Sequence, residues 1–268
     1  MLLCFRGAMK AINPRIWISA LCVLCFASSA HAEKVPDLTG TWAVKRTTRV
    51  VDSAPFIGTF HIDMVTIALF EGTSKGTQFT TRETVCKVSM TSSTSSVRAA
   101  PAPSLAKAVS GSKRSFRVGK GAKGVAFTYP KQASVWGARV KDPAKEKLPT
   151  DPKDPRVVDV DKDGKPGMTV SIRGLVSGEF HMVQRDVESW TGTLTADDRI
   201  EGSISWSFER SILDKTSAFL PSKNKGRADT SPKNNRFILQ KVGQGATCKD
   251  ILKSPDAFFA PRGSGSSP

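Results

Sequence analysis

The alternation of apolar and polar residues between positions 200 and 208 constrains the fold of this chain more than any other feature of the sequence. In the stretch IEGSISWSF, every second residue is apolar or glycine, and the residues between them are glutamate or serine. Because successive side chains of a strand point to opposite faces, this period of two predicts a strand that is buried on one face only. Residues 168–172 (MTVSI) alternate in the same way. Both stretches therefore predict an antiparallel sheet packed against a core.

Turn-forming residues separate these strands from their neighbours. Residues 175–178 (LVSG) and 196–198 (ADD) each predict a chain reversal, so residues 168–210 are expected to form a meander of three or four strands. Helix signals are few: residues 247–250 (TCKD) fit a capping box and predict a short C-terminal helix, and residues 104–109 predict one or two turns. Other alternating or β-branched stretches lie at residues 40–51, 60–70, 78–90 and 236–242.

Many short strands in one chain usually close into a barrel or fold into a sandwich, because closure removes exposed strand edges. We therefore predict an all-β fold, an antiparallel meander closed into a barrel, with a β-sandwich as the alternative. Residues 33–260 are expected to form a single β domain. Two stretches of it predict irregular insertions: residues 91–124, rich in Ser, Ala, Gly and Lys, and residues 141–167, which hold five prolines. The tail, residues 261–268, is expected to be disordered.

Residues 1–32 have the pattern of a secretory signal peptide. Arg6, Lys10 and Arg15 precede an uncharged run, and the sequence A-H-A that ends at Ala32 predicts cleavage there. The protein is therefore expected to be secreted or periplasmic. An uncleaved anchor helix is the alternative, but the apolar run is short for a bilayer core of about 30 Å. We expect no transmembrane span in the mature chain.

The cysteines and the net charge both change when the leader is removed. Cys86 and Cys248 are the two of the five cysteines that remain, and in an oxidising compartment they are expected to pair. The alternative, a reactive thiol, lacks a histidine nearby in sequence that would lower its pKa. Loss of the three basic leader residues lowers the net charge from +16 to +13, so the mature chain stays strongly basic.

The triplet Gly40-Thr41-Trp42 begins the first expected strand and resembles the G-x-W that opens lipocalin-like barrels. In that family the tryptophan closes one end of the barrel and an arginine on the last strand stacks across it, a role that the resemblance assigns to Arg236. The family also often ties its C-terminal segment to the barrel wall by a disulfide. In an unrelated β fold, Trp42 would be an ordinary core residue. The resemblance implies a cavity for a small apolar molecule or lipid, and we expect it to be lined by Trp42, Phe60, Met64, Met182, Ile204, Trp206 and Phe208.

Three aspartates on alternate residues run into a glycine in the stretch DVDKDGKPGMTVSI, which begins at Asp159. This spacing lets carboxylate oxygens converge on one cation, so Asp159, Asp161, Asp163 and the carbonyl of Lys165 are candidate calcium ligands. A glutamate at the twelfth position is missing, and a strand follows instead of a helix. Any Ca²⁺ site is therefore expected to be weak and structural. The alternative is an ordinary turn whose aspartates are neutralised by the lysines at positions 162 and 165.

Residues 112–141 interleave basic and aromatic residues, which is typical of a surface that binds an anionic polymer. For an exported protein such a partner would be an envelope polysaccharide or lipid head groups, and we expect no specific nucleic acid. A solvated, lysine-rich loop is the simpler interpretation. The expected basic surface consists of Lys113, Arg114, Arg117, Lys120 and Lys123.

Signatures of catalysis are absent from the sequence. There is no H-E-x-x-H zinc motif and no G-x-S-x-G nucleophile elbow. His61 and His181 each oppose apolar neighbours on an expected strand, so both are expected on an exposed face. Acid pairs of the kind that glycosidases use could be assembled only from strand residues expected to face water, namely Glu179, Asp186, Glu188 and Glu201. We therefore predict a binding protein and not an enzyme.

Overall fold

The computed structural model describes residues 34–54, 56–121, 124–223 and 225–261 of the chain. The predicted signal peptide, Lys123 and residues 262–268 of the predicted tail lie outside the described residues. Strands dominate the described part and the helices are short, which confirms the predicted all-β class.

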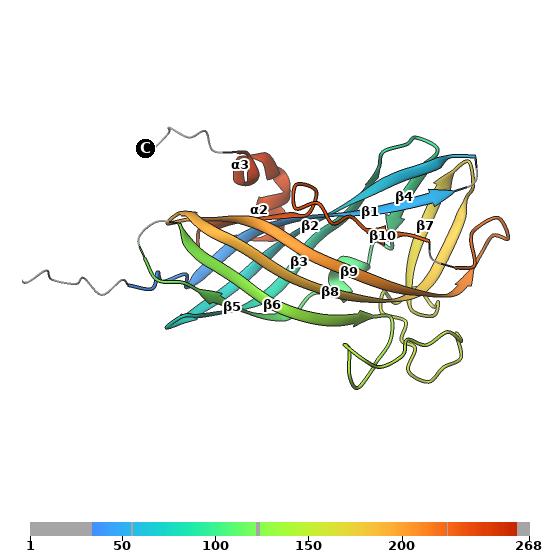
Figure 1. Cartoon of the computed structure of the whole chain (residues 1–268), viewed down its shortest axis with the longest axis horizontal. Helices are drawn as coiled ribbons and strands as arrows, with labels where there is room; N and C mark the ends of the chain where they lie inside the picture. The colour runs from blue at the N-terminus through green and yellow to red at the C-terminus, as the bar shows by residue number, and fades with distance from the viewer. Residues whose placement is uncertain (1–33, 55, 122–123, 224, 262–268) are drawn as a thin grey trace, which may run out of the picture. The chain divides into compact units, whose positions relative to one another are not determined.

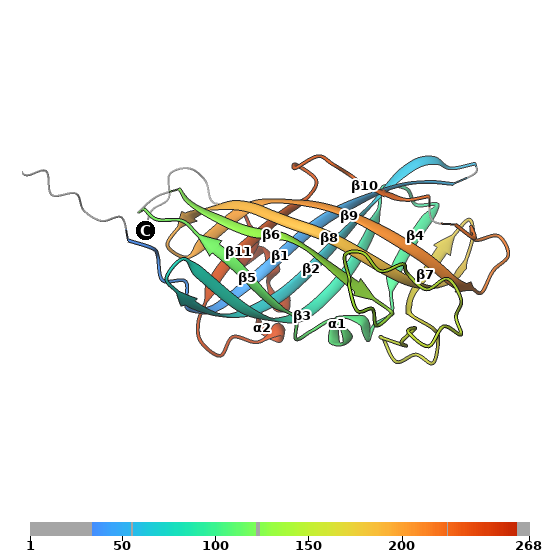
Figure 2. The same ribbon diagram turned by 60° about the horizontal axis from the view of Figure 1, so that its bottom comes forward.

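Eight strands pair antiparallel into a ring that the pairing of β8 with β9 closes (Figures 1 and 2). The closed antiparallel sheet was the predicted architecture, and a sandwich was the alternative. The ring is uneven, because its strands range from 6 residues in β5 to 19 residues in β8. In order around the ring the strands are β1 (Gly40–Ala54), β2 (Gly58–Lys75), β3 (Gln78–Ser92), β5 (Lys113–Val118), β6 (Val125–Trp136), β8 (Gly178–Ala196), β9 (Arg199–Lys215) and β11 (Arg236–Val242).

Three further strands lie outside the ring. β7 (Met168–Gly174) pairs with the first residues of β8, and β4 (Val97–Pro101) pairs with β7. The two-residue strand β10 (Arg227–Ala228) pairs with β1. β7, β8 and β9 follow one another as antiparallel neighbours, so the meander expected for residues 168–210 is present.

Two of the three short helices in the described part occur where the sequence predicts them, and the third, α3 (Pro255–Phe259), was not predicted. α1 (Leu105–Ala108) follows β4, and α2 (Cys248–Lys253) begins at a Thr247 capping box with Asp250. Cys86 on β3 forms a disulfide with Cys248, with the two Cα atoms 5.2 Å apart, which confirms the predicted pair. The bond fixes α2 to the sheet. Beside it, the apolar side chains of α2 and of α3 (Pro255–Phe259) pack against strand residues outside the main core; the buried members are Ala43, Ile67, Leu69, Ile251 and Phe259.

One end of the ring is filled by a tightly packed aromatic core. Phe237 lies over the facing glycines Gly192 and Gly202, where a Cβ atom on either glycine would meet its ring at 2.7 Å. Its ring centroid is 4.8 Å from that of Trp190. The largest side chains of this core are Trp42, Phe70, Phe79, Phe116, Phe127, Trp190 and Phe237.

Trp42 belongs to this core, and its indole Nε1 donates to the carbonyl of Leu38 at 2.8 Å. The residue across its ring is Lys241, with Nζ 5.7 Å from the ring centroid. Arg236 is exposed and pairs with Thr47, five residues further along β1 than Trp42. The expectation that Arg236 stacks across Trp42 is therefore wrong, because the register of β11 brings Lys241 opposite the tryptophan.

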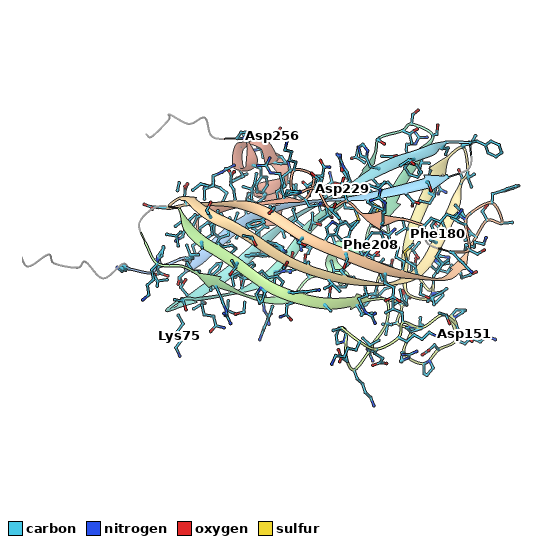
Figure 3. The ribbon with its side chains drawn as sticks, viewed as in Figure 1. Lys75, Asp151, Phe180, Phe208, Asp229 and Asp256 are labelled. Atoms are coloured by element: carbon cyan, nitrogen blue, oxygen red, sulfur yellow. A yellow bond between two sulfur atoms is a disulfide. The ribbon has the colours of Figure 1, made fainter. Side chains whose placement is uncertain are left out.

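The two predicted irregular insertions differ in outcome. Residues 91–124 contain β4, α1 and β5, so this stretch completes the sheet and is not an irregular insertion. Residues 141–167 contain neither helix nor strand in the structure. An isolated bridge between Ala138 and Val157 closes this loop, on which Figure 3 labels Asp151.

Candidate functional site

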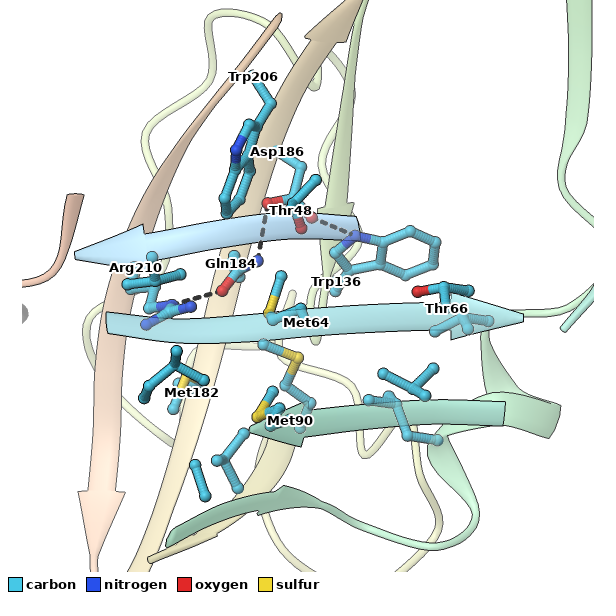
Figure 4. Close-up of a pocket in the computed structure, with 18 of the residues that line it drawn as sticks. Thr48, Met64, Thr66, Met90, Trp136, Met182, Gln184, Asp186, Trp206 and Arg210 are labelled. Carbon is cyan, nitrogen blue, oxygen red and sulfur yellow. Dashed lines mark hydrogen bonds between the residues drawn. The ribbon is translucent and has the colours of Figure 1, made fainter. Parts of the chain in front are cut away.

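A cavity of about 230 Å³ lies inside the ring, beyond the aromatic core. Part of its wall is apolar and rich in methionine: Figure 4 shows Met64, Met90 and Met182 with Trp206 on strands that face one another. Leu105 of α1 also lines the cavity. Methionine is flexible and polarizable, so such a wall adapts to ligands of different shape.

A polar row on β8 lines another part of the cavity wall, next to Met182. Gln184, Asp186 and Glu188 alternate along the strand and share the inward face with Met182 and Trp190. Asp186 accepts hydrogen bonds from the amide of Gln184 at 2.7 Å and from the indole Nε1 of Trp136 at 2.9 Å (Figure 4). The carboxylate is therefore fixed in position by two donors.

Arg210 of β9 extends this row into the cavity. Its Nε donates to Oε1 of Gln184 at 2.5 Å, and its guanidinium lies 4.2 Å from the ring centroid of Phe208. Among the described residues, no carboxylate lies within salt-bridge distance of Arg210, and its two Nη groups donate no hydrogen bond. The guanidinium therefore has donors left for a ligand.

Burial shifts the pKa values of Asp186 and Arg210. It raises the pKa of Asp186 to about 6, with the charge of Glu188 acting in the same direction. Burial lowers the pKa of Arg210, although Asp186 and Asp52 act against this shift. The row thus contains an acid that changes charge near neutral pH.

A salt-bridge network separates the polar row from the aromatic core. Glu83 accepts from Arg46 at 2.5 Å and from Arg114 at 3.2 Å, and Arg114 also pairs with Glu188. The guanidinium of Arg114 lies 5.3 Å from the ring centroid of Trp190. Burial acts to raise the pKa of Glu188, but the nearby arginines hold it below its ordinary value. These four charged groups are joined by salt bridges, whereas Arg210 has no salt-bridge partner among the described residues.

The structure corrects the expected cavity lining at three of seven positions. Met64, Met182, Ile204 and Trp206 line the cavity. Trp42 lies in the aromatic core, and neither Phe60 nor Phe208 lines the cavity. Phe208 instead stacks on Trp206, with ring centroids 5.2 Å apart.

The strand acids also differ from expectation. Asp186 and Glu188 line the cavity and do not lie on the outer face of the sheet, whereas Glu179 and Glu201 are not part of the lining. Sequence reasoning missed the inward position of Asp186 and Glu188, and it did not identify Gln184 or Arg210 as lining residues. Strand alternation could have identified these four residues. Each lies an even number of residues from Met182 or Trp206 and therefore on the same face of its strand as that predicted cavity residue.

The aspartate loop brings its three carboxylates together. Asp159, Asp161 and Asp163 each offer an oxygen within 4.8 Å of the others. Asp159 accepts from the backbone N–H groups of Asp163 and Gly164, at 3.2 and 2.9 Å. Lys165, the fourth expected ligand, donates its N–H to Asp163 at 2.8 Å.

Asp161 connects this loop to the sheet. It is 1% exposed, and its Oδ2 accepts from the N–H of Thr169 on β7 at 2.8 Å. Oγ1 of Thr169 lies 2.9 Å from Nδ1 of His181. His181 is therefore buried, and the expectation that it lies on an exposed face is wrong; His61 is half-buried. The aspartate loop covers the outer face of the sheet at His181.

The expected basic surface is only partly a surface. Lys113, Arg117 and Lys120 are exposed, but Arg114 is buried in the salt-bridge network, so its assignment to the surface is wrong. Alternation along β5 turns Arg114 inward, together with the buried Phe116. Lys123 lies outside the described residues.

A second, basic groove of about 280 Å³ lies on strands β1, β9 and β11. Of the basic residues that line it, Arg49 pairs with Asp63 and Arg199 pairs with Glu201. Lys45, Lys233 and Arg236 form no salt bridge within the described part of the chain. Below, the basic groove is represented by these three residues.

Within residues 34–261, apart from the few undescribed positions, no helix is both long enough and apolar enough to cross a membrane. Comparison with family models, curated proteins and solved structures finds no match to this chain.

Proposed function

We propose that this chain is an exported, non-catalytic binding protein whose ring of strands encloses a small amphipathic ligand. The apolar body of the ligand would lie against the methionine-rich wall, and an anionic head would accept hydrogen bonds from Arg210. The observation that carries the proposal is the guanidinium of Arg210, which lines the cavity with two Nη groups that have no acceptor among the described residues. Arg210 is half-buried, and a cation partly removed from water gains from a charge-assisted hydrogen bond, which a ligand anion would supply.

The size and chemistry of the cavity support a small ligand. Its volume of about 230 Å³ is below the range of roughly 300–1,000 Å³ that is typical of drug-sized sites. A medium-chain carboxylate fits this description better than a long-chain lipid. Each CH₂ group buried against the wall contributes about 0.8 kcal/mol. Met64, Met90, Met182 and Trp206 would provide most of that apolar surface.

The leader and the disulfide support export. Residues 1–32 have the charged, apolar and small-residue regions of a signal peptide. The Cys86–Cys248 disulfide is the kind of bond that persists in oxidising compartments. We infer a secreted or periplasmic location from the two together.

Calorimetric titration with octanoate and with octanol tests the proposal, because the two probes share a chain and differ in head-group charge. A charge-assisted hydrogen bond contributes about 1.5–3 kcal/mol, so octanoate should bind roughly 10- to 100-fold more tightly than octanol. Arg210→Gln should abolish that preference and leave octanol binding nearly unchanged. Arg82→Gln removes the same charge from an exposed position on β3 and should have no effect. Failure of both probes to bind the wild type, or an unchanged preference in Arg210→Gln, would reject the proposal.

The basic groove favours a second candidate function, binding of an anionic envelope polymer. Lys45, Lys233 and Arg236 carry three cations that no described acid pairs. Retention on dextran sulfate should weaken strongly as salt rises, since the Debye length is about 10 Å at 0.1 M.

Two triple variants of equal charge distinguish the groove from the basic surface. Changing Lys45, Lys233 and Arg236 to glutamine should reduce retention on the polymer by more than the same change at Lys113, Arg117 and Lys120. Equal losses would assign the retention to net charge alone, and a larger loss from the second variant would place the partner on the basic surface.

A further inference from the structure

The aspartate loop contains a buried acceptor that the protein leaves unsatisfied. Asp161 is 1% exposed, and its Oδ2 accepts from the N–H of Thr169. Its Oδ1 is buried and has no hydrogen-bond partner among the described residues. Leaving a buried acceptor unpaired costs about 1–3 kcal/mol, and more for a charged group. The position of this oxygen therefore points to a partner that the protein does not supply.

Among the described residues, no salt bridge brings a basic side chain to this oxygen. The lysines at positions 162 and 165 are the nearest basic residues in the sequence, yet neither forms a salt bridge with Asp159, Asp161 or Asp163 in the described structure. The alternative interpretation, in which these lysines neutralise the aspartates, is supported only by the charge of Lys165, which helps to lower the pKa of Asp163. Three carboxylates instead converge with oxygens within 4.8 Å of one another.

We propose that Asp159, Asp161 and Asp163 bind one hard divalent cation, Ca²⁺ in an exported protein, with the unpaired Oδ1 of Asp161 as a ligand. Oxygen–calcium distances are about 2.3–2.6 Å, so two oxygens on one ion lie at most about 5 Å apart. The observed spacing satisfies this limit. The ligands are all carboxylate oxygens, which suit calcium better than zinc. His181 is not part of this cluster of converging ligand atoms, and its Nδ1 contacts Thr169.

The cation would fix the aspartate loop to the wall of the sheet. Asp161 links the loop to Thr169, and the neighbours of Thr169 on β7, Met168 and Val170, line the cavity. The three aspartates are not part of the cavity lining, so binding of the cation can be tested without any cavity ligand. From the few charged ligands we expect a dissociation constant of about 10⁻⁴–10⁻³ M, as in extracellular calcium modules.

The test is a calcium titration of the full mature chain after removal of metal with EGTA, at ionic strength held constant with KCl. Thermal unfolding followed by circular dichroism should show a rise in Tm of about 5 °C or more at a hundredfold excess over the dissociation constant. Calorimetry should give one site per chain. Mg²⁺ and Zn²⁺ are titrated in parallel, and neither should reproduce the shift at equal concentration.

Three variants decide which residues bind the ion. Asp161→Asn and Asp163→Asn should each raise the calcium concentration that is needed to produce the Tm shift at least tenfold. Asp163 is exposed, so its variant remains informative even where Asp161→Asn fails to fold. Asp151→Asn changes an exposed aspartate of the same loop outside the cluster and should behave as wild type. Absence of a shift in the wild type, an unchanged shift in Asp163→Asn, or a response to Zn²⁺ alone would overturn the proposal.

Discussion

Replacement of Asp186 by asparagine should stabilise the protein above pH 6 and leave its stability unchanged below pH 4. The carboxyl group faces the cavity and accepts from Gln184 and Trp136. Burial raises its folded-state pKa from 3.8 to about 6, which means that the folded protein disfavours the ionised form. Asparagine has nearly the same shape and never ionises, so it removes this cost.

The sign follows from proton linkage. The folded state binds the Asp186 proton more tightly than the unfolded state, so the favourable contribution is fully present below the unfolded value of 3.8. It is lost as pH rises through the folded value of about 6. A shift of about two units corresponds to roughly 3 kcal/mol. Since Asp186 is half-buried beside the cavity, about 3 kcal/mol is the upper limit of the gain.

Urea unfolding at pH 4, 6 and 8, followed by far-ultraviolet circular dichroism with the disulfide intact, measures this difference. The free energy of unfolding of Asp186→Asn minus that of the wild type should be near zero at pH 4 and grow to its full value at pH 8. Asp214→Asn, at an exposed position on β9, serves as the control with equal charge change. A variant that is less stable than wild type at pH 8, or a difference independent of pH, would refute the reasoning.

Three further stability predictions follow from the packing. Arg114→Met leaves the buried Glu188 without its salt bridge and should lower the free energy of unfolding by about 3–5 kcal/mol, measured by urea unfolding. Cys248→Ser removes the disulfide and should lower the free energy of unfolding by about 2–5 kcal/mol. A reducing agent should cause the same loss in the wild type and no further loss in the variant. Gly202→Ala would force a Cβ into the carbonyl oxygen of the neighbouring strand and lower Tm strongly, whereas Gly243→Ala, which meets nothing within 4 Å, should leave Tm nearly unchanged. Equal Tm values for the two alanine variants would contradict the packing of Phe237 on the glycine pair.

Strand alternation predicts the fold well because burial of one face is a local property of the sequence. The period of two between residues 200 and 208 corresponds to β9, and the capping box at Thr247 corresponds to the start of α2. Composition was less informative. Residues 91–124 are rich in Ser, Ala and Gly, yet β4 and β5 form there, because their pairing with distant strands outweighs weak local preference.

The interior polar residues were missed because polar residues on strands were assumed to face water. Gln184 and Asp186 share the face of Met182, which already indicated that they point inward. The burial of His181 was not predictable in this way. It depends on a loop whose position over the sheet is set by contacts such as that between Asp161 and Thr169.

A crystal soaked with 8-bromooctanoate provides the most direct test of the ligand cavity. We expect an anomalous bromine peak inside the ring of strands, beside Met64 and Met90, with the carboxylate within hydrogen-bond distance of Arg210. A peak confined to the outer surface, or a ring interior filled by side chains, would contradict it.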